Sequence, residues 1–478
     1  MRRWRVVLFV ATALGTVVAV VRRKPGATLM PTGVIRRSTT MAGLGARVGT
    51  AAALTRAQQV FASAERRAEL DERLQMRTAE QVAATLGNMK GAMMKLGQMA
   101  SYLDDGLPEP LRLALQDLQQ DAPPMSGDLA AGVVAEELGD QPERVFAEWD
   151  PVPIAAASIG QVHRAMTHDG RAVAVKVQYP GVAEAVRSDL ETSDLITQAV
   201  RLVYPNFDTK AMANEIRDRL TEELDYTIEA DNQRLFAKYW DGHPTIHIPR
   251  VLPELSTRRV LTTELVIGAR FDELATWDQA ARDRTAETIF RFVFGSLYRL
   301  HAFNGDPHPG NYIFHDGGRV TFLDFGLVKR FTPAEVRLFE DLIQGMVLDR
   351  DPAALRSTLE DGNIIVRDAP VDDAALYEYL SHFYDLVLHD RDQAWTPEYA
   401  SETVRQIFDR GSAVAPYATG GGSAFVIIQR INLGLYALFG RLHATANWHR
   451  IACEIWPTVD GPPSTEMGKA EADWRLAR

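Results

Sequence analysis

The side chains best suited to phosphate chemistry are one lysine, two aspartates and one asparagine. Lys176 ends the strand-like stretch Val-Ala-Val-Lys, Asn311 stands five residues after Asp306, and Asp324 stands eighteen residues after Asp306. A lysine that points inward from a strand costs free energy unless an anion accepts its charge. Carboxylate and amide oxygens are hard ligands of the kind that Mg²⁺ prefers. These residues therefore predict a site for a phosphate-bearing ligand and Mg²⁺.

Protein kinases use the same residue types in the same order. In those enzymes the lysine contacts the α- and β-phosphates of ATP, and the first aspartate orients the acceptor hydroxyl or water. The asparagine and the second aspartate, which opens an Asp-Phe-Gly sequence in kinases and here, hold Mg²⁺. We therefore predict Lys176 and Asp306 as catalytic residues, Asn311 and Asp324 as metal ligands, and ATP with Mg²⁺ as cofactors.

These side chains need strands and turns to hold them. Residues 160–166 and 171–178 alternate in the manner of strands, and residues 168–170, His-Asp-Gly, predict the turn between them. A second strand pair is predicted around residues 316–318, Asp-Gly-Gly. We expect residues 262–266 to form a hinge whose backbone reads adenine, with Glu264 and Val266 as contact residues.

A helix is expected to supply the acidic partner of the lysine. Residues 211–239 read as one continuous helix, on which Asp225 and Glu229 share a face because they are four residues apart. Glu223 lies about 160° from Asp225 on such a helix. We therefore predict that Glu229 pairs with Lys176, with Glu223 as the alternative. A solvated acidic face is the other interpretation of these residues.

The sequence departs from that of an ordinary kinase near the phosphates. Where a glycine-rich loop is expected, residues 155–161 read Ala-Ala-Ala-Ser-Ile-Gly-Gln, and an alanine methyl group restricts close approach to phosphate. We predict that Ala155, Ala156, Ala157 and Ser158 contact ATP. Residues 331–333, Phe-Thr-Pro, start a helix soon after Asp324, which leaves no room for a typical peptide-docking activation segment.

A helix is also predicted before the kinase-like region. Apolar residues recur at spacings of four and three over residues 78–103. The opposite face carries glycines together with Lys95 and Gln98, which lie one turn apart. Because small residues permit close approach of another element, we infer that both faces are covered. Lys95 then either forms a structural salt bridge or, with Gln98, lies at a functional pocket.

Five motifs together resemble the UbiB (AarF) family of atypical, protein-kinase-like proteins. The match covers roughly residues 81–330, and its motifs are Lys-x-Gly-Gln at 95–98, the alanine loop at 155–161, Glu-x-Asp at 223–225, Asp-Pro-His-Pro-Gly-Asn at 306–311 and Asp-Phe-Gly at 324–326. The resemblance implies that the N-terminal extension folds over the nucleotide pocket, where Lys95, Gln98, Glu223 and Asp225 are regulatory. It also implies ATP or ADP binding, little protein kinase activity, and a role in isoprenoid-quinone or other membrane-lipid metabolism.

The N-terminal sixty residues carry ten Lys and Arg and no Asp or Glu, whereas the remaining chain has 42 basic and 63 acidic side chains. An apolar run at 6–21 would span only about 24 Å as a helix, against about 30 Å of hydrocarbon. A membrane anchor, a cleaved targeting segment and a peripheral tail all remain open. If the run spans, the flanking basic residues place the body on the cytoplasmic side of the membrane.

The expected architecture is an α+β, bilobal, protein-kinase-like fold with a helical extension packed over the nucleotide site. It divides into an anchor (1–45), the extension (46–125), a small mixed lobe (126–263), a mainly helical lobe (264–460) and a loose polar tail (461–478). The apolar stretch 425–442 contains two arginines and is expected to be a buried helix rather than a membrane span.

Composition limits the possible functions. The net charge of −11 argues against a nucleic-acid-coating protein, and the single cysteine excludes an intramolecular disulfide. We expect an ATP-dependent atypical kinase or ATPase, whose partners are ATP or ADP, a membrane lipid or isoprenoid-quinone precursor, and enzymes of lipid biosynthesis. The alternative is a nucleotide-gated pseudokinase that holds a lipid or recruits enzymes without phosphoryl transfer. A small-molecule phosphotransferase is disfavoured by the Lys95 and alanine-loop motifs.

Overall fold

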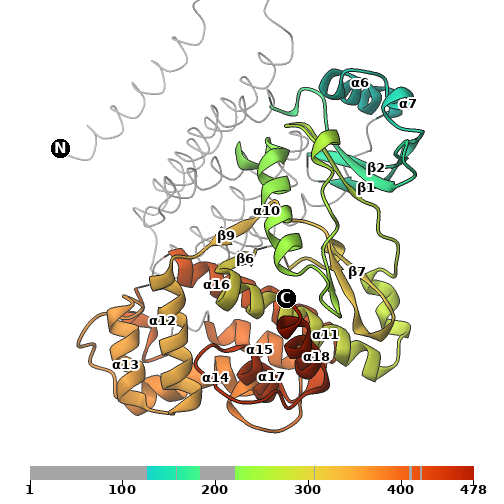
Figure 1. The fold of residues 1–478 in the computed structure, drawn as a ribbon. Helices are drawn as coiled ribbons and strands as arrows, with labels where there is room; N and C mark the ends of the chain where they lie inside the picture. Colours follow the sequence, from blue (N-terminus) through green and yellow to red (C-terminus); the bar gives the residue numbers. More distant parts are fainter. Residues whose placement is uncertain (1–125, 158, 184–220, 306, 408–411, 420–422) are drawn as a thin grey trace, which may run out of the picture.

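The structure is a computed structural model that describes residues 126–157, 159–183, 221–305, 307–407, 412–419 and 423–478 (Figure 1). The predicted anchor (1–45) and helical extension (46–125) lie outside the described residues. So do Lys95, Gln98, Ser158 and Asp306, so the expectations for these four side chains stay predictions.

The smaller lobe is a four-stranded antiparallel sheet in the order β1-β2-β3-β5. Helix α6 packs on it through Ala130, Val133 and Val134, which join Val173, Val175 and Val177 of β3 in one buried cluster. The elements of this lobe are α6 (Gly127–Leu138), α7 (Pro142–Val145), β1 (Glu148–Ala157), β2 (Gly160–Met166), β3 (Ala172–Gln178) and β5 (Val260–Glu264).

The predicted β-hairpin is present as β2 and β3. Gly170 has a φ of 83°, a left-handed conformation that glycine adopts without strain, at the turn between the strands. The alanine segment differs from the expectation of a loop. Ala155, Ala156 and Ala157 end strand β1, where they pair with Val162, Gln161 and Gly160 of β2. The alanines are therefore held by a sheet.

Helix α10 (Tyr226–Tyr239) corrects the prediction of one continuous helix over residues 211–239. The backbone leaves the helical conformation at Asp225, whose φ and ψ are −131° and 94°. The Asp225 carboxylate accepts a hydrogen bond from the Thr227 backbone N–H at 3.0 Å and caps the new helix. Residue spacing across this break therefore does not follow the 100° rotation of a helix.

The larger lobe is mainly helical and contains two small sheets, β4-β8-β7 and β6-β9, and a third pair, β10-β11. One large buried cluster, rich in aromatic residues, runs through it. Its helices are α11 (Gln279–Gly295), α12 (Pro333–Ile343), α13 (Pro352–Asp361), α14 (Asp373–Leu388), α15 (Pro397–Ile407), α16 (Ser423–Leu442), α17 (Trp448–Ile455) and α18 (Glu466–Leu476). Its strands are β4 (Ile246–His247), β6 (Ala302–Asn304), β7 (Tyr312–Phe314), β8 (Val320–Phe322), β9 (Val328–Arg330), β10 (Gln393–Ala394) and β11 (Thr445–Ala446).

Two helices of this lobe agree with the sequence analysis. Helix α12 begins directly after Thr332, whose side chain forms a capping box with Glu335. The apolar stretch 425–442 lies within the single helix α16. Among the described residues, no helix combines the length and the hydropathy that a membrane crossing requires.

The C-terminal segment corrects the prediction of a loose polar tail. Residues 466–476 form helix α18, and Met467 and Glu471 on this helix are buried. The Glu471 carboxylate is 1% exposed because it contacts Arg291 and Arg299, which the sequence pattern does not link to it. One acidic residue of this polar segment thus forms buried ion pairs with the large lobe.

Candidate nucleotide site

A cavity of about 330 Å³ lies between the sheet of the small lobe and the β7–β8 hairpin of the large lobe. Nine of the residues predicted for the ATP and metal site line it: Ala155, Ala156, Ala157, Lys176, Glu229, Glu264, Val266, Asn311 and Asp324. Most of them come from β1, β3, α10 and β5. Val266 lies two residues after β5, and Asn311 and Asp324 flank the β7–β8 hairpin. The fold thus brings together the described part of the predicted site.

Lys176 and Glu229 form the ion pair predicted from the sequence. The Lys176 Nζ lies 2.8 Å from each of the two Glu229 carboxylate oxygens. The side chains are 19% and 7% exposed, so the pair is largely withdrawn from water. The ring of Tyr226 lies beneath the ammonium, with its centroid 5.0 Å from Nζ. Its aromatic face adds a favourable cation–π contact.

Burial and the neighbouring carboxylates act on Lys176 in opposite directions. Burial favours the neutral amine, but the carboxylates of Glu229 and Asp324 outweigh it and raise the pKa of Lys176. The lysine is therefore a fixed cation near neutral pH. Burial raises the pKa of Glu229, and the Lys176 ammonium opposes that rise.

Asn311 and Asp324 are brought side by side by the pairing of β7 with β8. Asn311 immediately precedes β7, and Asp324 lies two residues after the end of β8. The antiparallel register pairs Tyr312 with Phe322, so both residues fall at the same end of the hairpin. The Leu323 backbone N–H donates to the Asn311 carbonyl at 2.9 Å and fixes this alignment.

The Asp324 segment is tied to its surroundings on both sides. The Gly326 N–H donates to Asp324 Oδ1 at 2.8 Å, and the Asn304 side chain donates to the Asp324 carbonyl at 2.6 Å. Phe325 is fully buried against Phe236 of α10, with 5.0 Å between the ring centroids. The aspartate is therefore anchored through its neighbour to the helix that carries Glu229.

Two predicted regulatory residues lie at the helix break and do not line the cavity. Asp225 caps α10, and one of its oxygens lies 3.6 Å from the Arg258 Nε. Glu223 lies just before the break, and the partner of Lys176 is Glu229 rather than this alternative. Their predicted regulatory role also involves Lys95 and Gln98, which lie outside the described part of the chain.

In the predicted hinge, residues 262–266, two backbone N–H groups form hydrogen bonds within the protein. The Glu264 N–H donates to the Arg250 carbonyl at 2.9 Å, and the Leu265 N–H donates to the Ala172 carbonyl at 3.0 Å. The Glu264 carboxylate lies 3.4 Å from His247, and this contact lowers its pKa. Two backbone donors of the segment are therefore already used within the fold.

Sequence reasoning missed several residues of this cavity. Gln233, Arg270 and His308 also line it. His308 belongs to the Asp-Pro-His-Pro-Gly-Asn sequence and could have been included from that motif. Gln233 lies four residues after Glu229 and therefore on the same face of α10. Nothing in the local sequence marks Arg270, which reaches the cavity because Ala269 bridges to Phe314.

Gly160 shows why the hairpin needs a glycine beside the alanines. A Cβ atom at this position would lie 2.3 Å from the Val177 carbonyl oxygen and 2.8 Å from the Tyr226 hydroxyl. Real Cβ atoms do not approach backbone oxygens so closely, so this position requires glycine. The close contact joins the start of β2 to the strand that carries Lys176.

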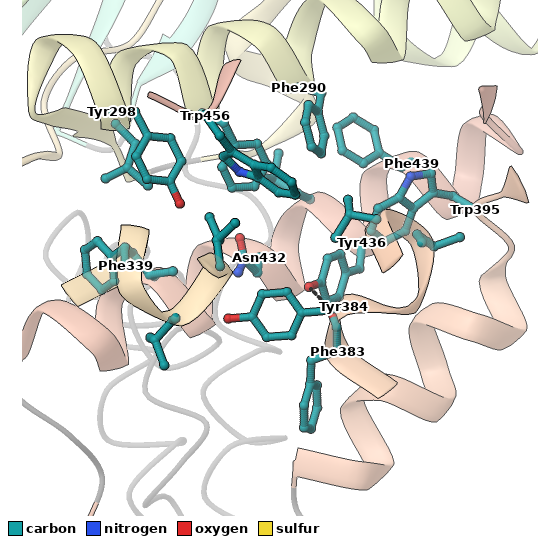
Figure 2. A pocket seen from close by; sticks show the side chains of 18 residues that line it. Phe290, Tyr298, Phe339, Phe383, Tyr384, Trp395, Asn432, Tyr436, Phe439 and Trp456 are labelled. Carbon is teal, nitrogen blue, oxygen red and sulfur yellow. Dashed lines mark hydrogen bonds between the residues drawn. The ribbon is translucent and has the colours of Figure 1, made fainter. Parts of the chain in front are cut away.

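A second cavity, of about 100 Å³, lies inside the large lobe and has a different character (Figure 2). Its lining consists of aromatic and aliphatic side chains with the amide of Asn432, and it contains no charged residue. Figure 2 shows Asn432 among the rings of Tyr384, Tyr436 and Trp456. Without a cation or a carboxylate, this cavity does not suit phosphate or Mg²⁺.

The donors of the inter-lobe cavity fit ATP and Mg²⁺. Asn311 and Asp324 supply oxygen ligands, and Lys176 supplies a cation for phosphate. Within the described residues, no group of three His, Cys, Asp or Glu could hold a metal by itself. Mg²⁺ commonly binds through one or two carboxylates together with substrate phosphates and water. The set therefore suits a metal that arrives with a nucleotide.

A strand lysine paired with a helix glutamate, above an Asp-Phe-Gly segment between two lobes, defines a protein-kinase-like fold. Comparison with known proteins agrees. Residues 117–358, about half of the chain, match the family model described as the ABC1 atypical kinase-like domain. The chain therefore belongs to this family of atypical kinases, the UbiB family, as the sequence motifs indicated.

Individual relatives support the same assignment. The chain is 35% identical over 256 residues to the rat protein named atypical kinase COQ8B, mitochondrial. This alignment covers 53% of this chain and 48% of the rat protein. It is 34% identical over 286 residues to the chloroplastic protein Activity of BC1 complex kinase 8 from Arabidopsis thaliana. This alignment covers 57% of this chain and 37% of the plant protein. The matches thus span about half or less of these two relatives.

A solved structure has the same fold. It is the complex of Rv3197 from Mycobacterium tuberculosis with erythromycin, with a TM-score of 0.61 and 29% sequence identity. The match covers 82% of this chain and 99% of that one. The similarity therefore extends beyond the residues matched by the family model.

Proposed function

We propose that this protein binds ATP with Mg²⁺ in the inter-lobe cavity and acts as an atypical kinase or ATPase. The observation that carries the proposal is the Lys176–Glu229 ion pair, with Nζ–O distances of 2.8 Å, in the same cavity as Asn311 and Asp324. A lysine held as a cation and two hard oxygen donors are what phosphoryl transfer requires of a protein.

Each residue then has a defined task. The Lys176 ammonium contacts the α- and β-phosphates, and Glu229 holds the lysine in position. Asn311 and Asp324 hold Mg²⁺, which supplies charge neutralisation for the phosphates when bound. Asp306 orients the acceptor hydroxyl or a water molecule, an assignment that rests on its place in the motif.

Adenine and phosphate recognition follow from the backbone of the hinge and of β1. Because the N–H groups of Glu264 and Leu265 already donate within the fold, the adenine contact falls to Val266 and to the hinge carbonyls. The methyl groups of Ala155 and Ala157 stand where a glycine-rich loop would let backbone N–H groups approach the phosphates. Slow turnover and weak protein kinase activity are the expected consequences.

We place this activity in isoprenoid-quinone or other membrane-lipid metabolism. Support comes from the resemblance to the UbiB family and from the basic, acid-free N-terminal sixty residues, which suit an anionic membrane surface. We propose that residues 6–21 hold the protein at the membrane with its body on the cytoplasmic side.

A nucleotide-gated pseudokinase is the second candidate. The observation that favours it is the pairing of Ala155, Ala156 and Ala157 with β2, because a strand is less adaptable around phosphates than a glycine loop. A pure binding protein would occupy the same cavity with ATP and transfer no phosphoryl group.

ATP hydrolysis by protein lacking residues 1–45, with and without lipid vesicles, tests the proposal. We expect Mg²⁺-dependent turnover that Asp324→Asn abolishes together with Mg²⁺-dependent nucleotide binding. Asp306→Asn should keep nucleotide binding and lose turnover. Unchanged hydrolysis by Asp306→Asn would remove the catalytic role and favour the pseudokinase.

A further inference from the structure

The C-terminal end of α10 is covered by helix α18 (Figure 1). The indoles of Trp240 and Trp474 are stacked, with 5.8 Å between ring centroids and 10° between planes. The Trp474 Nε1 donates to the Asp241 carbonyl at 2.9 Å. The Arg478 guanidinium donates to the carbonyls of Lys238, at 3.0 Å, and of Tyr239. The Lys238 and Tyr239 carbonyls belong to the last turn of α10, where the helix supplies no N–H donors for its own carbonyls, and Asp241 follows the C-cap residue Trp240.

Helix α18 is itself fixed to the large lobe by buried charges. Arg291 of α11 has no exposed side-chain surface and donates to Glu471 of α18 at 3.1 Å. It also contacts Glu454 at 2.5 Å and Glu287 at 2.7 Å. A second cation, Arg299, lies 3.1 Å from the other oxygen of Glu471. Moving α18 away would leave the buried charge of Arg291 without one of its carboxylate partners. This would cost stability, so the position of α18 is well determined.

The opposite end of α10 lies in the nucleotide site. Glu229, one turn from its start, holds Lys176 at 2.8 Å. Further along the same helix, Asn232 donates to the Phe325 carbonyl at 3.2 Å, and Phe236 packs on the Phe325 ring. One helix of fourteen residues therefore has the ion pair at one end and the α18 contact at the other.

We infer that Trp474 and Arg478 are positioning residues for the nucleotide site, which they reach through α10. By holding the C-terminal turn of α10 against the large lobe, they keep Glu229 within reach of Lys176. Docking of α18 and binding of nucleotide then favour each other, because coupling between two sites acts equally in both directions. The effect on nucleotide binding rests on the proposed function, whereas the effect on the position of α10 does not.

The test uses the full chain with Trp474→Ala, which removes the stack and the indole donor, and Trp474→Phe, which keeps an aromatic ring. Leu359→Ala is the stability control, because Leu359 is buried in α13 of the same lobe and does not line the nucleotide cavity. Without nucleotide, we expect faster amide hydrogen exchange over residues 226–239 in Trp474→Ala than in Leu359→Ala. Equal exchange in the two variants would overturn the inference whether or not the protein binds ATP.

A double-mutant cycle adds a readout that a merely structural role would not affect. Trp474→Ala should raise the Kd for ATP with Mg²⁺ by about fivefold or more, with Trp474→Phe intermediate. In a Glu229→Gln background, the same change should have little further effect, because the route through Glu229 is already lost. Full additivity of the two variants would overturn the inference. Absence of ATP binding by the wild-type protein would instead overturn the proposed function.

Discussion

Asn232 of α10 donates a hydrogen bond from its Nδ2 to the carbonyl of Phe325, 3.2 Å away and 93 residues later in the chain. Its Oδ1 accepts from Arg330 Nη2 at 3.3 Å. Asn232 stands three residues after Glu229, so the helix that orients Lys176 also holds the segment that carries Asp324. One helix, α10, therefore helps to position both Lys176 and Asp324.

Asn232→Leu should loosen the segment that carries Asp324. The change leaves the buried Phe325 carbonyl without its donor, which costs about 1–3 kcal/mol of stability. We expect the Mg²⁺ concentration needed for half-maximal nucleotide binding to rise, because Asp324 is less firmly placed. Thr288→Val is the matched control, since Thr288 donates to the Gly318 carbonyl at 2.7 Å away from the nucleotide cavity. An equal shift in both variants would contradict this role.

Glu229→Gln should weaken nucleotide binding through Lys176. Loss of one partner of a buried ion pair typically costs about 3–5 kcal/mol, because the other charge stays buried. We expect a lower unfolding midpoint and at least a tenfold higher Kd for ATP, measured by calorimetry. Asp231→Asn makes the same chemical change on the same helix, at a carboxylate that is 63% exposed and pairs with Arg234, and should alter neither quantity.

His243 should make the free energy of unfolding decrease as the pH is lowered. Burial, together with the positive charges of Arg291 and Arg475, lowers the pKa of His243 to about 3. The unfolded chain binds a proton at this histidine below about pH 6.5, whereas the folded protein does not until about pH 3. Stability from this group is therefore complete above pH 6.5 and is lost between pH 6.5 and 3, by about 2 kcal/mol from pH 7 to 5.

His243→Asn tests this expectation by urea unfolding at pH 7 and pH 5. The Nδ1 atom accepts from the backbone N–H groups of Thr245, at 3.2 Å, and Ile246, at 3.0 Å, and an asparagine oxygen can replace it as acceptor. The variant should lose about 2 kcal/mol less than wild type over this range. Identical losses would show that His243 is protonated in the folded protein.

Asn432→Leu should stabilise the large lobe. No hydrogen-bond partner for the buried Asn432 Oδ1 is found among the residues that the structure describes, although the atom lies at the aromatic cavity. Such an atom costs about 1–3 kcal/mol, and leucine has a similar volume, so we expect a gain of about 1 kcal/mol in unfolding free energy. Destabilisation by this variant would show that the amide has a partner within the cavity.

The residues of the site and their immediate supports follow from the sequence. Alternation and the His-Asp-Gly turn predicted the β2–β3 hairpin that carries Lys176, and residues 331–333, Phe-Thr-Pro, predicted where α12 begins. The hairpin and the helix start depend on neighbours within a few residues, whose types restrict the backbone directly. Glu229 was chosen as the lysine's partner from spacing on a helix expected to be continuous over residues 211–239, and the choice is correct although the helix breaks at Asp225. Motif order then placed Asn311 just before and Asp324 just after one predicted strand pair, so that both lie at the same end of the β7–β8 hairpin.

The tertiary structure decided what depends on distant residues. A continuous apolar pattern concealed the helix break at Asp225. The apolar residues keep their helical spacing, and the only local sign of the break is the single carboxylate that caps α10. The polar C-terminal segment looked loose, but its Glu471 meets Arg291, 180 residues earlier in the chain. A buried cation and a carboxylate so far apart carry no local signal of each other. Only the packing of α11, α17 and α18 brings them together, and with them the far end of α10.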